Sequence, residues 1–126
     1  MRILIADDNV PFRTRLGSIL GGIEGIEIVE ETGDVPGTLN ALEQSRPDTI
    51  ILDIHMPGGT GLDVLRAVKR TKPAPTVIML TVGPRSEYQT ESFLCGADYF
   101  FEKTSELAKM AVMLRRMAKR DSAKKS

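Results

Sequence analysis

Five short apolar runs alternate with five segments of helical periodicity along this chain, and no other feature of the sequence restricts the fold as strongly. The strands predicted from these runs are Arg2–Ala6, Ile26–Glu31, Thr49–Leu52, Thr76–Thr81 and Ala97–Phe101. Strands that alternate with helices are typical of a parallel sheet with helices on both faces, because each crossover between parallel strands must be right-handed. With 126 residues the chain has room for one such domain. We therefore predict an α/β fold with a five-stranded parallel sheet.

Helix signals fill the intervals between these strands. Asn9 and Asp34 are suitable N-terminal caps, and each stands two residues before a proline, Pro11 or Pro36, which the first helical turn accepts. Two later helices are predicted from about Gly61 to Thr71 and from Ser86 to Cys95. No Gly-x-Gly-x-x-Gly motif opens the first helix, and the chain is too short for a dinucleotide-binding pair of halves. The strand order we expect is 2-1-3-4-5, the flavodoxin-like arrangement.

The last helix has the most regular amphipathic pattern in the chain. We expect Thr104 or Ser105 to cap it, because both side chains can accept a hydrogen bond from the first turn. Its apolar face includes Leu107, Leu114 and Ala118. We predict that residues 1–118 form the domain and that residues 119–126 form a basic, disordered tail.

Composition excludes several classes of function. The chain has 17 basic and 17 acidic residues, so no overall field attracts it to nucleic acid or to a membrane. No apolar stretch approaches the length of a membrane span, and the first apolar run is too short and too soon followed by acid for a signal peptide. Cys95 is the single cysteine, which fits a reducing compartment. We expect a cytoplasmic protein that makes no direct contact with nucleic acid or membrane.

Polar side chains stand where four of the predicted strands end. Asp7 and Asp8 follow the first strand, and Asp53 follows the third, just before a loop rich in glycine. Thr81 ends the fourth strand, and Lys103 follows the fifth. The carboxyl ends of parallel strands share one edge of the sheet, and that edge is where open α/β sheets bind ligands. Three carboxylates, a hydroxyl and an ammonium are therefore expected to converge there.

Carboxylates that converge repel one another and require a counter-charge. Two of them ~4 Å apart cost about 4 kcal/mol at the effective dielectric near a protein surface. Oxygen ligands suit Mg²⁺ or Mn²⁺, and Lys103 adds a fixed positive charge. An acidic nucleophile, a divalent cation, a lysine and a hydroxyl together make a site suited to phosphoryl transfer. Each residue alone has a plainer interpretation, such as a helix cap or a solvated charge, and only their coincidence favours the site.

The sequence resembles the receiver domains of response regulators, the phosphoacceptor modules of two-component signalling. The resemblance extends from Met1 to about Ala118. The residues that carry it are Asp7-Asp8, Asp53-x-x-Met56-Pro57-Gly58-x-x-Gly61, Thr81 and Lys103. Each motif alone is weak, but four motifs at the ends of the right strands are highly specific.

The resemblance implies that Asp53 accepts a phosphoryl group from the phosphohistidine of a histidine kinase or phosphotransfer protein. It implies that Asp7, Asp8, Asp53 and the backbone carbonyl of His55 bind Mg²⁺. The His55 side chain is then a surface group that modulates the access of water.

Three further residues receive implied roles in the response to phosphorylation. Lys103 pairs with the phosphoryl oxygens, and Thr81 donates a hydrogen bond to them after it swings inward. Phe100, with Tyr99 as a second candidate, is the aromatic residue that rotates with Thr81. These movements reshape a face that binds an output partner, which the resemblance leaves unidentified. It also leaves open whether the phosphorylated form is a homodimer.

The sequence departs from the family pattern at three positions. Thr104 follows Lys103, whereas many receivers carry a proline with a cis peptide bond at that position. The pair Lys103-Thr104 instead resembles the branch of the family whose members often carry helix-turn-helix output domains. Phe100 replaces a common tyrosine. Val82 stands where the family usually has a small residue, so we expect it to narrow the approach to Asp53 and slow phosphoryl exchange. No output domain follows the last predicted helix, so we expect a regulator that acts alone or a receiver separated from its output domain.

Two alternatives remain at this stage. The first is an interaction module of the same fold that works without phosphorylation, although the complete set of site residues argues against it. The second is a Mg²⁺-dependent phosphohydrolase that uses Asp53 as its nucleophile. Haloacid-dehalogenase-like phosphatases carry an acid two residues after the nucleophile, and this chain has His55 there. We expect a phosphoacceptor that assists its own phosphorylation and dephosphorylation, not an enzyme that turns over a separate substrate.

Overall fold

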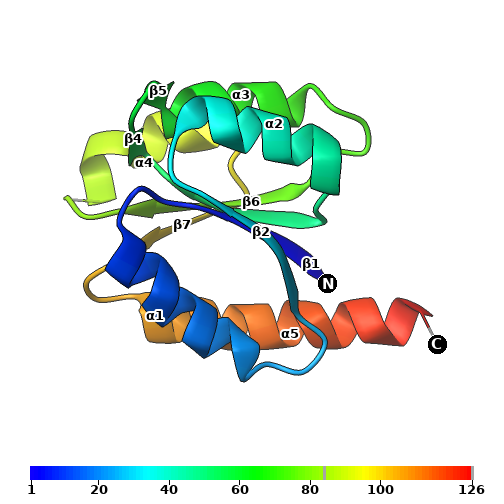
Figure 1. Cartoon of the computed structure of the whole chain (residues 1–126). Coiled ribbons are helices and arrows are strands. Elements are labelled where there is room, and N and C mark those ends of the chain that lie inside the picture. Colours follow the sequence, from blue (N-terminus) through cyan, green and yellow to red (C-terminus); the bar gives the residue numbers. More distant parts are fainter. Residues whose placement is uncertain (84, 126) are drawn as a thin grey trace.

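A parallel sheet of five strands lies between two layers of helices (Figure 1). The structure is a computed structural model that describes residues 1–83 and 85–125, with side chains for all of these except residues 85, 86 and 125. The sheet has the order β2-β1-β3-β6-β7, which is the predicted order. Its strands are β1 (Arg2–Ala6), β2 (Glu27–Thr32), β3 (Thr49–Asp53), β6 (Thr76–Thr81) and β7 (Tyr99–Glu102). Two short strands, β4 (His55–Met56) and β5 (Gly59–Thr60), form a separate antiparallel ribbon.

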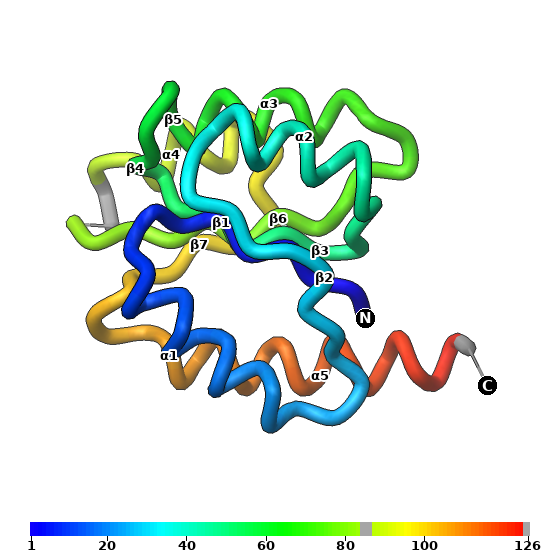
Figure 2. Tube along the Cα trace, in the orientation of Figure 1, coloured from blue at the N-terminus to red at the C-terminus, as the bar shows by residue number. Residues whose placement is uncertain are grey.

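The helices divide between the two faces of the sheet. Figure 1 shows α1 (Val10–Gly21) and α5 (Leu107–Lys125) on one face. The trace in Figure 2 follows α2 (Val35–Ser45), α3 (Gly61–Lys69) and α4 (Arg85–Leu94) over the other face. The strands are apolar on both sides because each side packs against helices. In β1, for example, Leu4 belongs to the core under α2 and α3, and Ile3 and Ile5 belong to the core under α1 and α5.

Two predicted helix caps are confirmed. The side chain of Asn9 accepts a hydrogen bond of 3.0 Å from the backbone nitrogen of Phe12, and that of Asp34 accepts one of 2.6 Å from the backbone nitrogen of Gly37. Apart from the last helix, the boundaries of the other predicted elements differ from the structure by at most two residues, as is normal for element ends. Within the described residues no helix is long and apolar enough to cross a membrane.

The predicted cap of the last helix is wrong. Helix α5 begins at Leu107, so Glu106, and neither Thr104 nor Ser105, occupies the capping position. The hydroxyl of Ser105 donates to Glu102 over 2.8 Å, and the Glu106 carboxylate accepts a bond of 3.0 Å from the backbone nitrogen of Glu102. These side-chain bonds hold residues 103–105 in a turn, which delays the start of the helix.

Helix α5 also continues beyond the expected domain boundary at Ala118, as far as Lys125. The carboxylate of Asp121, in the segment expected to be a tail, lies 3.3 Å from the N-terminal ammonium group of Met1. That ion pair joins the last turns of α5 to the start of β1. The predicted boundary at Ala118 is therefore not marked by an end of this helix.

Candidate functional site

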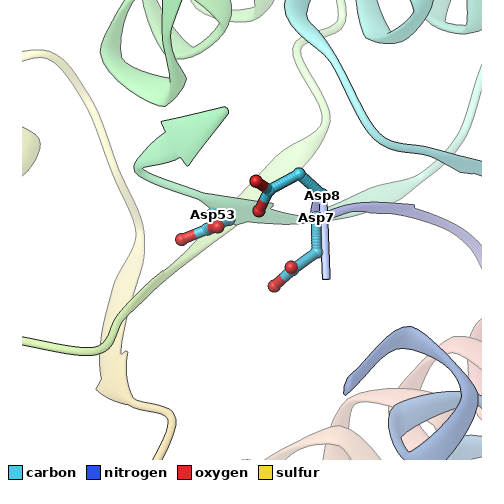
Figure 3. A group of neighbouring side chains, drawn as sticks. All are labelled: Asp7, Asp8 and Asp53. Atoms are coloured by element: carbon cyan, nitrogen blue, oxygen red, sulfur yellow. The ribbon is translucent and has the colours of Figure 1, made fainter. Parts of the chain in front are cut away.

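The ends of four neighbouring strands bring the predicted site residues to one edge of the sheet. Parallel pairing places Ala6 beside Leu52, Asp53 beside Leu80, and Thr81 beside Glu102. The residues that end or follow these strands therefore meet, as the sequence predicted. Figure 3 shows the carboxylates of Asp7, Asp8 and Asp53 grouped at this edge. One oxygen from each of the three lies within 4.8 Å of the others.

Lys103 supplies the predicted counter-charge. Its ammonium forms an ion pair with Oδ2 of Asp7 and lies 3.3 Å from Oδ2 of Asp53. The backbone nitrogen of Lys103 donates a bond of 2.8 Å to the carbonyl of Thr81, which fixes where the lysine leaves the sheet. The side chain of Lys103 is 8% exposed, and those of Asp7 and Asp53 are 1% and 5% exposed. The three charges are therefore held together with little water between them.

Burial is the main influence on the acidity of Asp53. It raises the pKa of the Asp53 carboxyl group from an ordinary value of 3.8 to about 6. The positive charge of Lys103 opposes that rise, the negative charge of Asp7 adds to it, and hydrogen bonds from Lys103 and from the backbone of His55 oppose it. Burial disfavours the charged form of the Asp53 carboxyl group. The Lys103 ammonium, which Asp53 shares with Asp7, compensates only part of this cost.

Asp8 differs from the two buried carboxylates. It is exposed, and within the described part of the chain its carboxylate makes no hydrogen bond or ion pair. The donor set is thus two buried carboxylates that share one lysine and a third carboxylate that is open to solvent. Hard oxygen donors of this kind fit Mg²⁺ or Mn²⁺, which retain several waters and need few protein ligands.

The start of α3 packs closely against the backbone of Asp53 and Ile54. The backbone nitrogen of Gly61, the first residue of α3, donates a bond of 2.6 Å to the carbonyl of Ile54. A Cβ atom on Gly61 would lie 2.1 Å from the carbonyl oxygen of Asp53, so this position admits only glycine without a shift of the backbone. The ring of His55 is exposed and makes an edge contact with Tyr88 of α4, with 5.1 Å between the ring centres.

The hydroxyl of Thr81 is completely buried, and it has no hydrogen-bond partner within residues 1–83 and 85–125. Phe100 is 4% exposed and belongs to the core that also includes residues of α2 and α3, and its ring centre lies 6.4 Å from that of Phe93. Tyr99 packs instead against the core on the α1 and α5 face, so of the two candidates Phe100 is the one on the α4 side. Val82 is 63% exposed and points largely to solvent.

Comparison with known proteins agrees with this geometry. Residues 3–115 match the family model of the response regulator receiver domain. The chain belongs to that family. It is therefore a receiver domain of two-component signalling.

Several relatives are similar over most of this receiver. The response regulator GacA of Pseudomonas viridiflava is 29% identical over 115 residues, which are 91% of this chain and 54% of GacA. The protein-glutamate methylesterase/protein-glutamine glutaminase 5 of Myxococcus xanthus is 34% identical over 109 residues, which are 86% of this chain and 31% of that protein. The chain thus spans about half or less of the length of these relatives.

Solved structures show the same fold. A LuxR-family two-component response regulator from Aurantimonas sp. SI85-9A1 superposes with a TM-score of 0.84 at 21% identity, over 93% of this chain and 84% of that one. The response regulator domain of Thermotoga maritima CheB gives a TM-score of 0.82 at 23% identity, over 95% and 94% of the two chains.

Three contacts of this receiver site were not predicted from the sequence. The ring centre of Phe12 lies 4.5 Å from the ammonium of Lys103. The guanidinium of Arg13 donates a bond of 2.8 Å to the carbonyl of Asp7, and the backbone nitrogen of Asn9 donates one of 2.8 Å to the Asp7 carboxylate. In the sequence, Phe12 falls on one helical face with Leu16, Ile19 and Leu20, and no sequence signal connects that face with Lys103.

Proposed function

We propose that this receiver accepts a phosphoryl group on Asp53 from the phosphohistidine of a histidine kinase or phosphotransfer protein. The observation that supports this most directly is the buried carboxylate of Asp53, with the Lys103 ammonium 3.3 Å away and two further carboxylates beside it. In the reaction a carboxylate oxygen of Asp53 attacks phosphorus and forms an acyl phosphate. The P–N bond of the phosphohistidine breaks, and its electron pair remains on the imidazole.

The acidity of Asp53 suits this role. An attacking carboxylate must be ionised, and a pKa of about 6 leaves most of the group ionised at pH 7. Burial raises the pKa and removes water from the nucleophile, whereas Lys103 keeps the ionised form populated. The environment therefore supports a carboxylate that is both charged and poorly solvated, which favours attack on a phosphoryl group.

A divalent cation at Asp7, Asp8 and Asp53 supplies charge neutralisation for the phosphoryl oxygens when bound. Asp8 is the open ligand, because neither a hydrogen bond nor an ion pair engages it within the described residues. The backbone carbonyl of His55 is the proposed fourth protein ligand. Lys103 can then pair with a phosphoryl oxygen while it keeps its contact with Asp7.

The response to phosphorylation starts at Thr81 and continues to the output face. The phosphoryl oxygens offer the buried Thr81 hydroxyl the acceptor that it lacks within the described chain. We propose that Thr81 moves toward them and that Phe100 moves with it, which alters the face formed by α4, β7 and α5. A change from mostly inactive to mostly active requires the modification to favour one state by roughly 5 kcal/mol.

The experiment is intact-mass analysis after incubation with acetyl phosphate and Mg²⁺. We expect the addition of one phosphoryl group, which Asp53→Ala abolishes and which Glu24→Gln, a change of an exposed acid elsewhere, leaves intact. Chelation of Mg²⁺ should also prevent it. Unchanged labelling of Asp53→Ala would contradict the assignment of the acceptor.

The same preparation tests the alternatives. A wild-type chain that neither gains mass nor responds to beryllofluoride with Mg²⁺ would support an interaction module that works without phosphorylation. Sustained hydrolysis of a generic phosphate ester would support a phosphohydrolase. Light scattering with and without beryllofluoride measures whether the activated form is a homodimer.

A further inference from the structure

We propose that Phe12 is a positioning residue for the phosphoacceptor site, because its ring face holds the Lys103 ammonium between Asp7 and Asp53. The inference rests on the proposed function of the site and extends it to a residue of α1. The ammonium nitrogen lies 4.5 Å from the centre of the Phe12 ring. A cation at this distance over an aromatic face is attracted by the negative charge density of the ring.

The ammonium is enclosed on three sides. An ammonium group has three N–H donors and no acceptor. Here it faces a carboxylate oxygen of Asp7, a carboxylate oxygen of Asp53 at 3.3 Å, and the ring of Phe12. Only 8% of the lysine side chain is exposed. The Phe12 ring therefore excludes water from the third side of the ammonium and restricts the movement of the lysine. Phe12 therefore completes the enclosure that the two acids leave open.

A closed series of contacts fixes the ring in this place. The Asp7 carboxylate accepts a bond of 2.8 Å from the backbone nitrogen of Asn9 through Oδ1. The Asn9 side chain caps α1 by accepting a bond of 3.0 Å from the backbone nitrogen of Phe12, the third residue of that helix. The Phe12 ring contacts Lys103, and Lys103 returns to Asp7 through Oδ2. The start of α1 and the end of β7 are thus joined through one carboxylate.

The aromatic character of residue 12 is required, and not only its volume. An aliphatic side chain could also pack beside Leu16 and Ile19, with which Phe12 shares a core. It would offer the ammonium no region of negative charge, and the flexible four-carbon stem of lysine would gain freedom. An ammonium already in place reduces the rearrangement required when phosphoryl oxygens arrive.

The test compares Phe12→Leu, which removes the ring face, with Phe12→Tyr, which keeps it. Phe101→Leu is the matched control, because Phe101 is also a half-buried aromatic residue of the same core. The first measurement is the second-order rate constant of phosphorylation by acetyl phosphate with Mg²⁺. We expect Phe12→Leu to lower it by roughly three- to tenfold, and Phe12→Tyr and Phe101→Leu to stay within about twofold of wild type.

The second measurement is independent of phosphorylation. In the absence of Mg²⁺, a ring above the ammonium should shift the NMR signals of the Lys103 ε-protons upfield in the wild type. Phe12→Leu should remove this shift, and Phe12→Tyr should keep it. Because the wild-type signal itself reports the contact, the test does not depend on the folding of any variant.

The outcomes separate this inference from the function on which it rests. Failure of the wild type to gain a phosphoryl group at Asp53 would overturn the proposed function, and the ε-proton shift would still show whether Phe12 holds the lysine. Normal labelling of the wild type with an unshifted Lys103 signal would overturn only the role of Phe12. Equal loss of rate in Phe12→Leu and Phe12→Tyr, or an unchanged rate in Phe12→Leu, would overturn it as well.

Discussion

Gly61 approaches Asp53 so closely that a Cβ atom on the glycine would lie 2.1 Å from the aspartate's carbonyl oxygen. The contact places the first residue of α3 directly behind the proposed phosphoacceptor. Gly61→Ala should therefore lower the free energy of unfolding by on the order of 1–3 kcal/mol or more, because backbone atoms must move to admit the methyl group. Gly21→Ala is the control, since a Cβ atom there would meet nothing within 4 Å. Urea unfolding of both variants measures the difference, and equal stabilities would refute the close approach.

The pKa of Asp53 predicts a pH-dependent effect of Asp53→Asn. The folded-state pKa of about 6 exceeds the ordinary value of 3.8, so the folded chain binds the proton more tightly than the unfolded chain. The contribution of Asp53 to stability therefore falls as the pH rises from about 4 to about 6. Without Mg²⁺, Asp53→Asn should be more stable than wild type at pH 7.5 by on the order of 3 kcal/mol. The gain should vanish near pH 4, and a gain that is independent of pH would contradict the assignment.

Lys103 should be coupled to both of its acidic neighbours. Lys103→Met leaves two buried carboxylates without their ammonium, so we expect a loss of about 3 kcal/mol at pH 7.5 and a pKa of Asp53 above its present value. Protonation relieves the repulsion, so the loss should shrink toward pH 4. In a double-mutant cycle, Asp53→Asn should restore part of the stability that Lys103→Met removes. Strict additivity of the two changes would show that the groups do not interact.

Mg²⁺ should stabilise the wild type through Asp8. A ligand that binds only the folded state at a hundred times its dissociation constant adds about 2.7 kcal/mol. Because Asp8 is exposed and makes no hydrogen bond or ion pair within the described residues, Asp8→Ala should change the stability of the metal-free protein little. The same variant should lose most of the rise in Tm with added Mg²⁺, whereas Glu24→Gln should keep it. Thermal melts with and without the metal decide between these outcomes.

Val82→Ala should affect kinetics and not stability. Val82 is 63% exposed, so its truncation should alter the free energy of unfolding by less than about 0.5 kcal/mol. We predict that phosphorylation and dephosphorylation both become faster, because the side chain follows Thr81 at the edge where Asp53 lies. Phosphoprotein decay measured by mass gives the second rate. If neither rate changes, Val82 does not restrict access.

The sequence was informative where a residue's position follows from the end of a strand. Asp7, Asp53 and Thr81 each end or follow an apolar run, and parallel pairing alone brings such positions to one edge. The sequence was less informative about contacts between side chains on different elements. The helical spacing of Phe12, Leu16 and Ile19 indicates a shared apolar face but does not reveal that Phe12 contacts Lys103. The spacing of apolar residues predicts which side chains are buried, but not which residues of other elements they contact.

The error at the start of α5 has a related cause. Thr104 and Ser105 have the composition of a helix cap, but the Ser105 hydroxyl donates to the Glu102 carboxylate and the Glu106 carboxylate accepts from the backbone nitrogen of Glu102. These bonds form a turn before α5 begins at Leu107. At the far end, the same helix continues to Lys125 through polar residues whose composition suggested a tail. The pairing of Asp121 with the N-terminal ammonium depends on the tertiary arrangement, which no local pattern contains.

The hydroxyl of Thr81, which has no hydrogen-bond partner among the described residues, lowers the local stability of this receiver. A hydroxyl shut away from water with no acceptor among the described residues weakens the fold at that spot by on the order of 1–3 kcal/mol. An incoming oxygen atom would relieve this destabilisation as well as form a new bond. Under the proposed switch, part of the driving force is thus stored in the unmodified domain before any signal reaches it.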